Sequence, residues 1–209
     1  MSDYARRERA ALADLLVEVG PDAPTLCAGW NTSDLAAHLV IRERRPDAAL
    51  GMLIPPLAAH GDKVRRAQAA KPYADAVDEV RNPPWWSPVS NPVTDELANG
   101  LEFFIHHEDV RRARPDWAPR VLDTGEQKAL WGAVRLTARL GLRKAHVPVR
   151  LRAPGFGEMS VGGDEPLATL IGEPGELALF VSGRQRYARV EIDGPAEVAE
   201  RLRTANLSM

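Results

Sequence analysis

Two histidines and two acidic residues stand at spacings that would place them around one divalent cation. Glu102 and His106 are four residues apart in LEFFIHHED and Asp109 follows three residues later, so a helix would carry all three on one face. His38 lies in a second helical segment, DLAAHLVIRER, beside leucines. Imidazole and carboxylate groups are standard zinc ligands, and facing helices often build such sites. We therefore predict that His38, Glu102 and His106 bind one divalent metal ion.

Helical spacing alone leaves other interpretations open. A glutamate and a histidine four residues apart also occur as surface pairs, and a histidine beside leucines also occurs as a satisfied core residue. Asp109 has two interpretations as well. It could accept a hydrogen bond from a ligand or position water behind the metal, or it could form an ion pair with Arg112 one turn later.

Arginines follow both ligand segments within one or two helical turns, at Arg42, Arg45 and Arg112. Their guanidinium groups could bind a carboxylate or the polar groups of a thiol cofactor, because guanidinium matches such acceptors in a planar, bidentate manner. Alternatively, they complement the negative ends of their helix dipoles. We keep both interpretations.

Composition excludes several classes of function. The 209 residues carry a formal net charge of −2, which gives no reason to expect a nucleic acid or an anionic membrane as partner. The single cysteine, Cys27, excludes an intrachain disulfide and zinc sites that need two or four cysteines, and we expect a structural thiol.

The N-terminal segment lacks the apolar region of a signal peptide, and no stretch approaches the roughly 18 apolar residues of a membrane span. We expect a soluble cytoplasmic protein.

The elements that must position the ligands are helices. Apolar residues recur at helical spacing through the first 145 residues, and prolines and capping residues delimit the segments. The expected helices cover 5–19, 32–45, 57–71, 73–81, 94–114 and 123–142. Residues 32–34 are expected to cap the helix that carries His38, and residues 94–96 the helix that carries Glu102 and His106. The four prolines within 81–92 predict a loop.

The pattern changes near residue 146. The segments HVPVRLR (146–152) and YARVEI (187–192) alternate apolar and polar residues and predict half-buried strands. Residues 173–182 and 195–205 are expected to be helices. The predicted fold class is therefore α+β, with a helical bundle over residues 1–145 and a small α+β domain over residues 146–209.

The two ligand segments resemble the signatures of a known superfamily. Trp30 to His38 follows the pattern W-x-x-x-D-L-x-x-H, and Glu102 to Asp109 follows E-x-x-x-H-x-x-D, as in the DinB-like superfamily. The segments PTLCAGW, DLAAHLVIRERRPDAA and EFFIHHEDVRRARPDW are similar to the mycothiol-dependent maleylpyruvate isomerase branch, in particular to an actinobacterial group described mainly as metal-binding. The resemblance implies a DinB-like four-helix bundle and a C-terminal domain like sterol carrier proteins. It also implies the same three metal ligands.

The resemblance further implies a chemistry. Three protein ligands leave a fourth position open, as in catalytic zinc sites, and the family places a mycothiol thiolate there, which adds to a small electrophilic substrate in isomerisation or S-transfer. Zinc is the expected ion, although nickel or iron suits the same ligands. The family's helix that ends in a Gly-Arg pair adds Arg184 as a candidate substrate-binding residue. The family typically has an aromatic residue directly before its aspartate, whereas this sequence reads HHED at that place. We therefore do not carry maleylpyruvate over as the expected substrate.

Two alternative functions use the same residues. A metal-dependent hydrolase would hold water at the open position. A non-catalytic binding module would use the metal only to stabilise the bundle, while its C-terminal part captured an apolar ligand.

Overall fold

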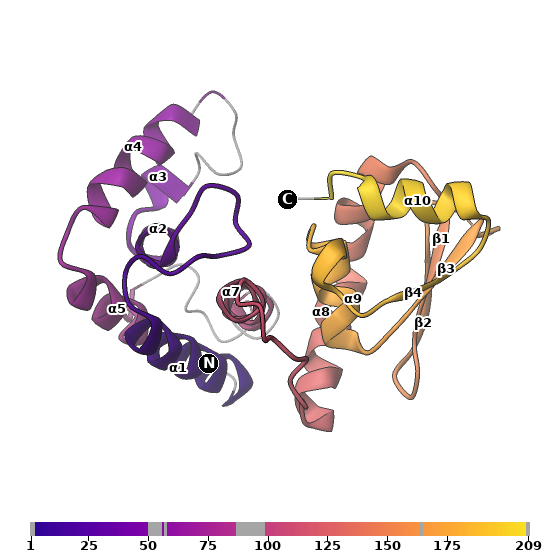
Figure 1. Cartoon of the computed structure of the whole chain (residues 1–209), viewed down its shortest axis with the longest axis horizontal. Helices are drawn as coiled ribbons and strands as arrows, with labels where there is room; N and C mark the ends of the chain where they lie inside the picture. The colour runs from indigo at the N-terminus through magenta and orange to yellow at the C-terminus, as the bar shows by residue number, and fades with distance from the viewer. Residues whose placement is uncertain (1–2, 50–55, 57, 87–98, 164, 208–209) are drawn as a thin grey trace. The chain divides into compact units, whose positions relative to one another are not determined.

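The fold is α+β, as the sequence predicted (Figure 1). The computed structural model describes residues 3–49, 56, 58–86, 99–163 and 165–207. The chain forms two compact units, Met1–Pro119 and Arg120–Met209. Within the described residues, the first unit consists of helices, and these are α1 (Asp3–Val19), α2 (Thr32–Arg44), α3 (Pro46–Ala49), α4 (Ala58–Ala69), α5 (Tyr73–Arg81) and α7 (Gly100–Arg111).

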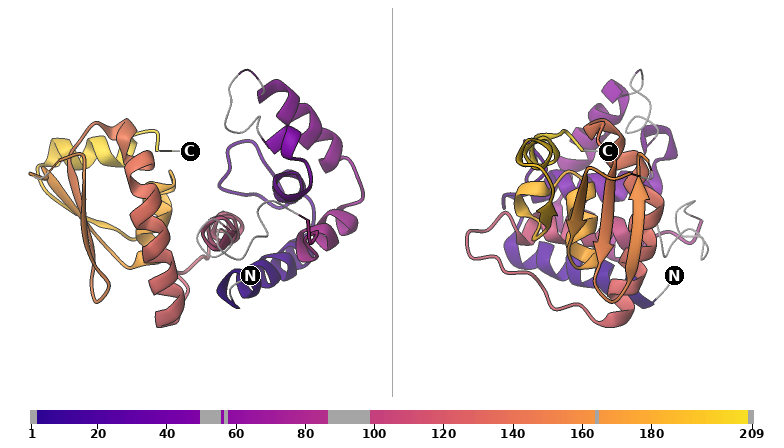
Figure 2. Two further views of the ribbon diagram at one scale, coloured as in Figure 1. Left: turned by 180° about the vertical axis from the view of Figure 1, so that it is seen from behind. Right: turned by 90° about the vertical axis from the view of Figure 1, so that its right-hand side faces the viewer.

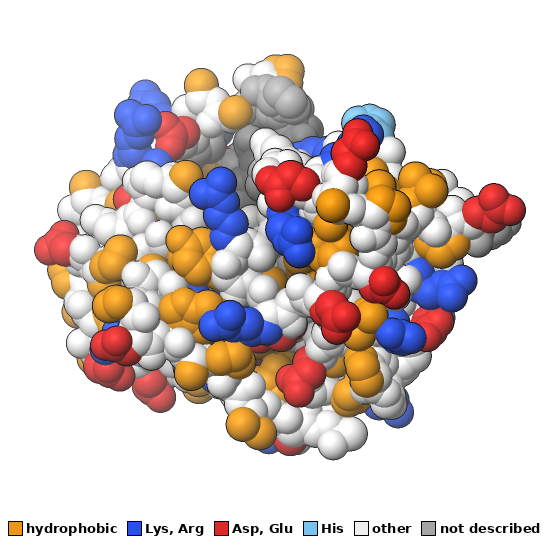
Figure 3. All heavy atoms as spheres, turned by 45° about the vertical axis from the view of Figure 1, so that its right-hand side comes forward, with side chains coloured by type: hydrophobic (Ala, Val, Ile, Leu, Met, Phe, Trp, Pro, Cys, Tyr) orange, Lys and Arg blue, Asp and Glu red, His pale blue; other side chains and the backbone are white. Residues whose placement is uncertain are grey.

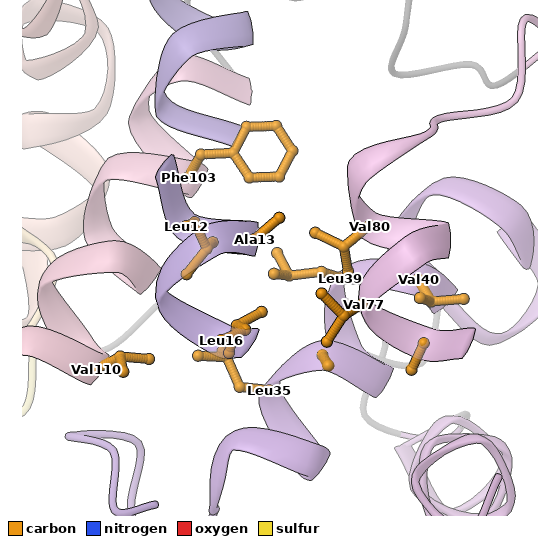
Figure 4. Packing of buried hydrophobic residues seen from close by; sticks show 12 residues of the cluster. Leu12, Ala13, Leu16, Leu35, Leu39, Val40, Val77, Val80, Phe103 and Val110 are labelled. Carbon is orange, nitrogen blue, oxygen red and sulfur yellow. The ribbon is translucent and has the colours of Figure 1, made fainter. Parts of the chain in front are cut away.

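The core of the first unit is built from apolar residues spaced one helical turn apart. Such pairs share a face of their helix and point together at the neighbouring helices (Figure 4). Helix α1 packs against α5 and α7, and α2 packs against α4 and α5. The paired side chains are fully or almost fully buried, and they are Leu12 and Leu16, Leu35 and Leu39, and Val77 and Val80. Each buried leucine or valine stabilises the fold by about 1.5–3 kcal/mol.

The N-cap of α2 lies one residue before the predicted cap at 32–34. The N-cap is Asn31, whose extended backbone lets its side-chain oxygen accept the Asp34 backbone N–H at 3.0 Å. Asp34 Oδ2 in turn accepts the Asn31 N–H at 3.4 Å, which completes a capping box. The hydroxyls of Thr32 and Ser33 donate instead to the carbonyls of Gly20 and Pro21, so they fasten the end of α1 to the start of α2.

The other helix predictions of the first unit are confirmed in large part. The helices expected over 57–71 and 73–81 are α4 and α5. The cap expected at 94–96 lies outside the described residues. Helix α7 ends at Arg111, with Arg112 as its C-cap, three residues earlier than predicted. Pro115 disfavours helical backbone at the residue before it, but it does not determine at which earlier residue the helix ends.

The second unit is a four-stranded sheet with helices. Its elements are α8 (Thr124–Leu142), β1 (Val149–Ala153), β2 (Gly157–Val161), β3 (Ala168–Ile171), α9 (Pro174–Val181), β4 (Glu191–Asp193) and α10 (Ala196–Thr204). The strand order is β2-β1-β3-β4, with β1 and β3 parallel and the outer pairs antiparallel. Figure 2 shows α8 and α9 together on one face of this sheet. The expected helices over 123–142, 173–182 and 195–205 are confirmed.

Strand predictions were less complete. The segment 146–152 contributes β1, which starts at Val149, and 187–192 contributes only the start of β4 after a short 3-10 turn at Gln185–Tyr187. Strands β2 and β3 were not predicted. Both are short, and β2 (GEMSV) has exposed or half-buried residues at four of its five positions, so apolar alternation does not mark it.

The two units divide near residue 120, whereas the sequence analysis placed the boundary near 145. Helix α8 packs lengthwise against α9, and a Cβ on Gly141 would lie only 2.3 Å from the Val181 carbonyl oxygen. A larger residue at 141 would therefore separate the two helices. The spacing of apolar residues predicts that α8 is a helix, but it does not predict against which neighbouring element the apolar face of α8 packs.

Acidic, basic and apolar side chains are interspersed on the face drawn in Figure 3, in keeping with the net charge of −2. No helix within the described part of the chain combines the length and the apolar character needed to cross a membrane.

Candidate metal centre

Helices α2 and α7 bring the three predicted ligands together inside the first unit. His38 Nε2 lies 3.1 Å from Glu102 Oε1, and His106 Nε2 lies 3.3 Å from the same oxygen. The two imidazole rings meet edge to face, with centroids 5.0 Å apart. Their Nε2 atoms and one carboxylate oxygen therefore converge on one point from two helices that are about sixty residues apart in sequence.

The spacing of these atoms fits a metal ion. Zinc bonds of about 2.0–2.1 Å to nitrogen or oxygen in a tetrahedron require ligand atoms about 3.3 Å from one another. The two separations from Glu102 Oε1, 3.1 and 3.3 Å, match that requirement, and all three candidate ligand atoms lie within 4.8 Å of one another. The side chain of Glu102 is 27% exposed, whereas those of His38 and His106 are 11% and 9% exposed. Of the three side chains, Glu102 is thus the one least covered by the fold.

Asp109 holds the far nitrogen of His106. Its Oδ2 accepts a hydrogen bond from His106 Nδ1 at 2.9 Å, and Asp109 is fully buried. A proton on Nδ1 leaves the lone pair on Nε2, which is the nitrogen that faces Glu102 and His38. Asp109 therefore lies directly behind a candidate ligand, where one of its two interpretations requires it, and its role toward a metal stays a prediction.

Cys27 also contacts Asp109, which the sequence analysis did not anticipate. Its thiol donates to Asp109 Oδ2 at 3.2 Å, and its sulfur lies 4.0 Å from His106 Nδ1. Cys27, His106 and Asp109 consequently form a second group whose atoms could hold a cation. Because Asp109 already accepts hydrogen bonds from the other two residues, the geometry favours a supporting network behind His106. No spacing signal links position 27 to position 109.

The loop between α1 and α2 places Cys27 and a tryptophan against the centre. The Leu26 backbone N–H donates to the carbonyl of Asp109 at 3.1 Å, which ties the loop to α7. The Thr25 hydroxyl accepts the Cys27 N–H and donates to the Trp30 carbonyl, so the loop is closed on itself. The Trp30 ring packs on His38, with centroids 5.3 Å apart. This packing limits rotation of the His38 imidazole.

The three candidate ligands have shifted pKa values. Burial lowers the pKa of His38 below its ordinary 6.5, and the hydrogen bond with Glu102 offsets only part of this effect. Burial also opposes charge on Glu102 and His106, but the hydrogen bonds among these groups and Asp109 outweigh it. They hold the pKa of Glu102 well below 4.5 and that of His106 well above 6.5. Without a metal, the centre is therefore a carboxylate beside one protonated imidazole.

Arg42 is the predicted substrate-binding arginine that lies at the centre. Its Nε is 3.5 Å from Glu102 Oε1, and its guanidinium donates to the Asn99 side-chain oxygen. The Arg42 side chain is 15% exposed. A positive group fixed beside the Glu102 carboxylate is suitably placed for an anionic group of a bound molecule.

The other predicted arginines lie elsewhere. Arg45 forms an exposed ion pair with Asp47. Arg112 is buried at the end of α7 and pairs with Glu108, which favours a structural role for its guanidinium. Arg184 belongs to the second compact unit, where it donates to a backbone carbonyl of its own turn. Contact of Arg45, Arg112 or Arg184 with a substrate stays a prediction.

Comparisons of the chain with protein-family models, with curated proteins and with solved structures found no match.

Proposed function

We propose that this chain binds one zinc ion through His38, Glu102 and His106, with a fourth position left open for a small-molecule thiol. One observation carries the proposal. Two histidine Nε2 atoms and a carboxylate oxygen from two helices converge at separations of 3.1 and 3.3 Å, with a buried aspartate behind one of the histidines. Three nitrogen or oxygen ligands with an open fourth position are characteristic of catalytic zinc.

The proposal extends to a reaction class, an isomerisation or S-transfer that uses mycothiol and a small electrophilic substrate. A bound zinc ion would supply stabilisation of a thiolate at neutral pH. Arg42, beside the open edge of Glu102, would hold an anionic group of the thiol or the substrate. Asp109 would keep His106 oriented, and Trp30 would cover His38 and keep water from that side. Nickel or iron would be accepted by the same ligands.

The same proposal assigns the helical unit to the DinB-like superfamily and the second unit to the sterol-carrier-like domains of the isomerase branch. The assignment is supported by the paired motifs W-x-x-x-D-L-x-x-H and E-x-x-x-H-x-x-D. It is also supported by the succession of a helical unit and a small unit with a mixed sheet.

Metal content tests the site directly. Purified wild type should contain about one equivalent of metal by elemental analysis, whereas His38→Ala and Glu102→Ala should contain little or none. His60→Ala is the matched control, because His60 is half exposed and pairs with Asp47 outside the centre. Equal metal content in wild type and in the two ligand variants would overturn the site.

Cobalt substitution tests the thiol. The cobalt-loaded protein should develop a sulfur-to-cobalt charge-transfer band when mycothiol is added, because the thiolate would enter the open position. The same titration of Cys27→Ser should give the same band, which excludes the protein's own sulfur as its source. A cobalt protein that stays unchanged with mycothiol but hydrolyses an ester would replace the thiol chemistry with the hydrolase alternative.

A further inference from the structure

A pocket lies on the other side of α2 from the candidate metal centre. It has a volume of about 340 Å³ and lies between α2, α4 and α5. Val40 and Arg44, which are four residues apart, line it from α2. His38 and Arg42 lie on the opposite face of that helix, because two residues correspond to a rotation of about 200°. The pocket and the metal centre therefore share a helix but no side chain.

Cationic side chains dominate the pocket. Four guanidinium or ammonium groups line it against the single carboxylate of Glu79, and they belong to Arg44, Arg45, Lys63 and Lys71. Arg45 is already paired with Asp47. The ammonium groups of Lys63 and Lys71 form no ion pair or hydrogen bond with any residue that the structure describes. The pocket thus gathers positive charge that the described part of the chain does not neutralise.

Arg44 is the most informative of these groups. Its Nη2 donates to the Asn82 carbonyl at 2.8 Å, but its Nε is buried and has no acceptor among the described residues. A carbonyl oxygen satisfies one donor without neutralising the guanidinium. Arg44 therefore keeps a positive charge at the pocket, and the oxygens of an anion would neutralise it.

The pocket also has an apolar part. Val40, Val64 and Ala67 line it next to the cations. Its volume exceeds what an inorganic ion fills and lies within the range of small-molecule sites. The lining therefore suits a molecule with a hydrocarbon part as well as acidic oxygens.

We propose that this pocket binds a small organic anion. Its acidic oxygens would contact Arg44, Lys63 and Lys71, and its apolar part would rest on Val40 and Val64. Phosphate monoesters and carboxylates share this chemistry. The proposal does not depend on the metal centre, because none of the pocket residues is a metal ligand.

Titration calorimetry of the full chain with phenyl phosphate, benzoate and inorganic phosphate tests the proposal. The metal-free His38→Ala variant is used, so that an anion cannot bind at the metal. Phenyl phosphate should bind at least about fivefold more tightly than inorganic phosphate, because only the ester reaches the apolar lining. Comparable binding of benzoate would identify the ligand class as carboxylates, and weak binding of benzoate would identify phosphate esters.

Charge variants locate the binding. Lys63→Gln and Lys71→Gln should each weaken phenyl phosphate binding about threefold, and Arg44→Gln about tenfold. Arg66→Gln is the control, because Arg66 lies on the same helix but is 74% exposed, pairs with Asp62 and does not line the pocket. The two lysine variants keep the test valid if Arg44→Gln does not fold. Absence of binding at millimolar phenyl phosphate, or an equal loss with Arg66→Gln, would overturn the proposal.

Discussion

Asp109 Oδ2 lies 2.9 Å from His106 Nδ1, on the side of the imidazole that faces away from Glu102. The buried aspartate thereby fixes which ring nitrogen carries the proton and keeps Nε2 available toward the metal centre. The Cys27 thiol donates to the same carboxylate oxygen. The supporting network thus spans the loop before α2 and the helix α7.

Asp109→Asn should lower metal affinity about 10- to 100-fold, because a neutral amide lacks the negative charge that makes His106 a more basic ligand through its Nδ1–H. Competition with a chromophoric chelator measures the change. Asp75→Asn, at an exposed position on α5, is the matched control and should leave the affinity unchanged. If Asp109→Asn binds metal as tightly as wild type, Asp109 does not orient His106.

Metal binding should release a proton near neutral pH. The pKa of His106 is held well above 6.5, so the metal-free imidazole is protonated at pH 7 and must lose its Nε2 proton when it ligates a cation. Metal affinity should therefore rise with pH until it passes the raised pKa of His106. Titration calorimetry in two buffers of different ionisation enthalpy measures the released protons. Equal heats in both buffers would contradict the protonated state of His106.

Glu102 and His106 should stabilise the metal-free protein most between pH 4.5 and 6.5. The lowered pKa of Glu102 gives stability that is present above 4.5 and is lost as pH falls through the lowered value. The raised pKa of His106 gives stability that is present below 6.5 and is lost as pH rises through the raised value. The difference in unfolding free energy between wild type and Glu102→Gln, measured in urea without metal, should peak in this window. A difference that does not change with pH would show that the pair is not ionised as described.

The buried ion pair between Arg9 and Glu43 joins α1 to α2 and should be costly to break. Arg9 also donates to the Val80 carbonyl at 2.7 Å, and its guanidinium stacks 4.2 Å from the Phe103 ring centroid. Glu43→Gln should destabilise the first unit by about 3–5 kcal/mol, because it leaves a buried guanidinium unpaired. The double variant Arg9→Met with Glu43→Leu should cost clearly less than the sum of the single changes. Additive losses in urea unfolding would show that the two groups are not coupled.

The predicted ligands could be recognised in the sequence because helical spacing is local. Glu102, His106 and Asp109 share a face of α7 by their spacing alone. The cap predicted at 32–34 lies within one residue of the observed N-cap of α2, the helix that carries His38. The sites that the sequence analysis missed depend on long-range contacts. Cys27 meets Asp109 across 82 residues, and nothing in the spacing of the chain indicates that contact.

The sequence by itself determined that helices carry the candidate ligands, that an α+β segment follows, and that one cysteine excludes an intrachain disulfide and cysteine-rich zinc sites. Only the tertiary structure decided that the Nε2 atoms of His38 and His106 face one oxygen of Glu102, and that α8 groups with the sheet instead of with the ligand helices. The physical reason is the same in both cases. Backbone hydrogen bonds and side-chain periodicity act within a few residues, whereas the partner of a polar or apolar face is selected by the packing of the whole unit.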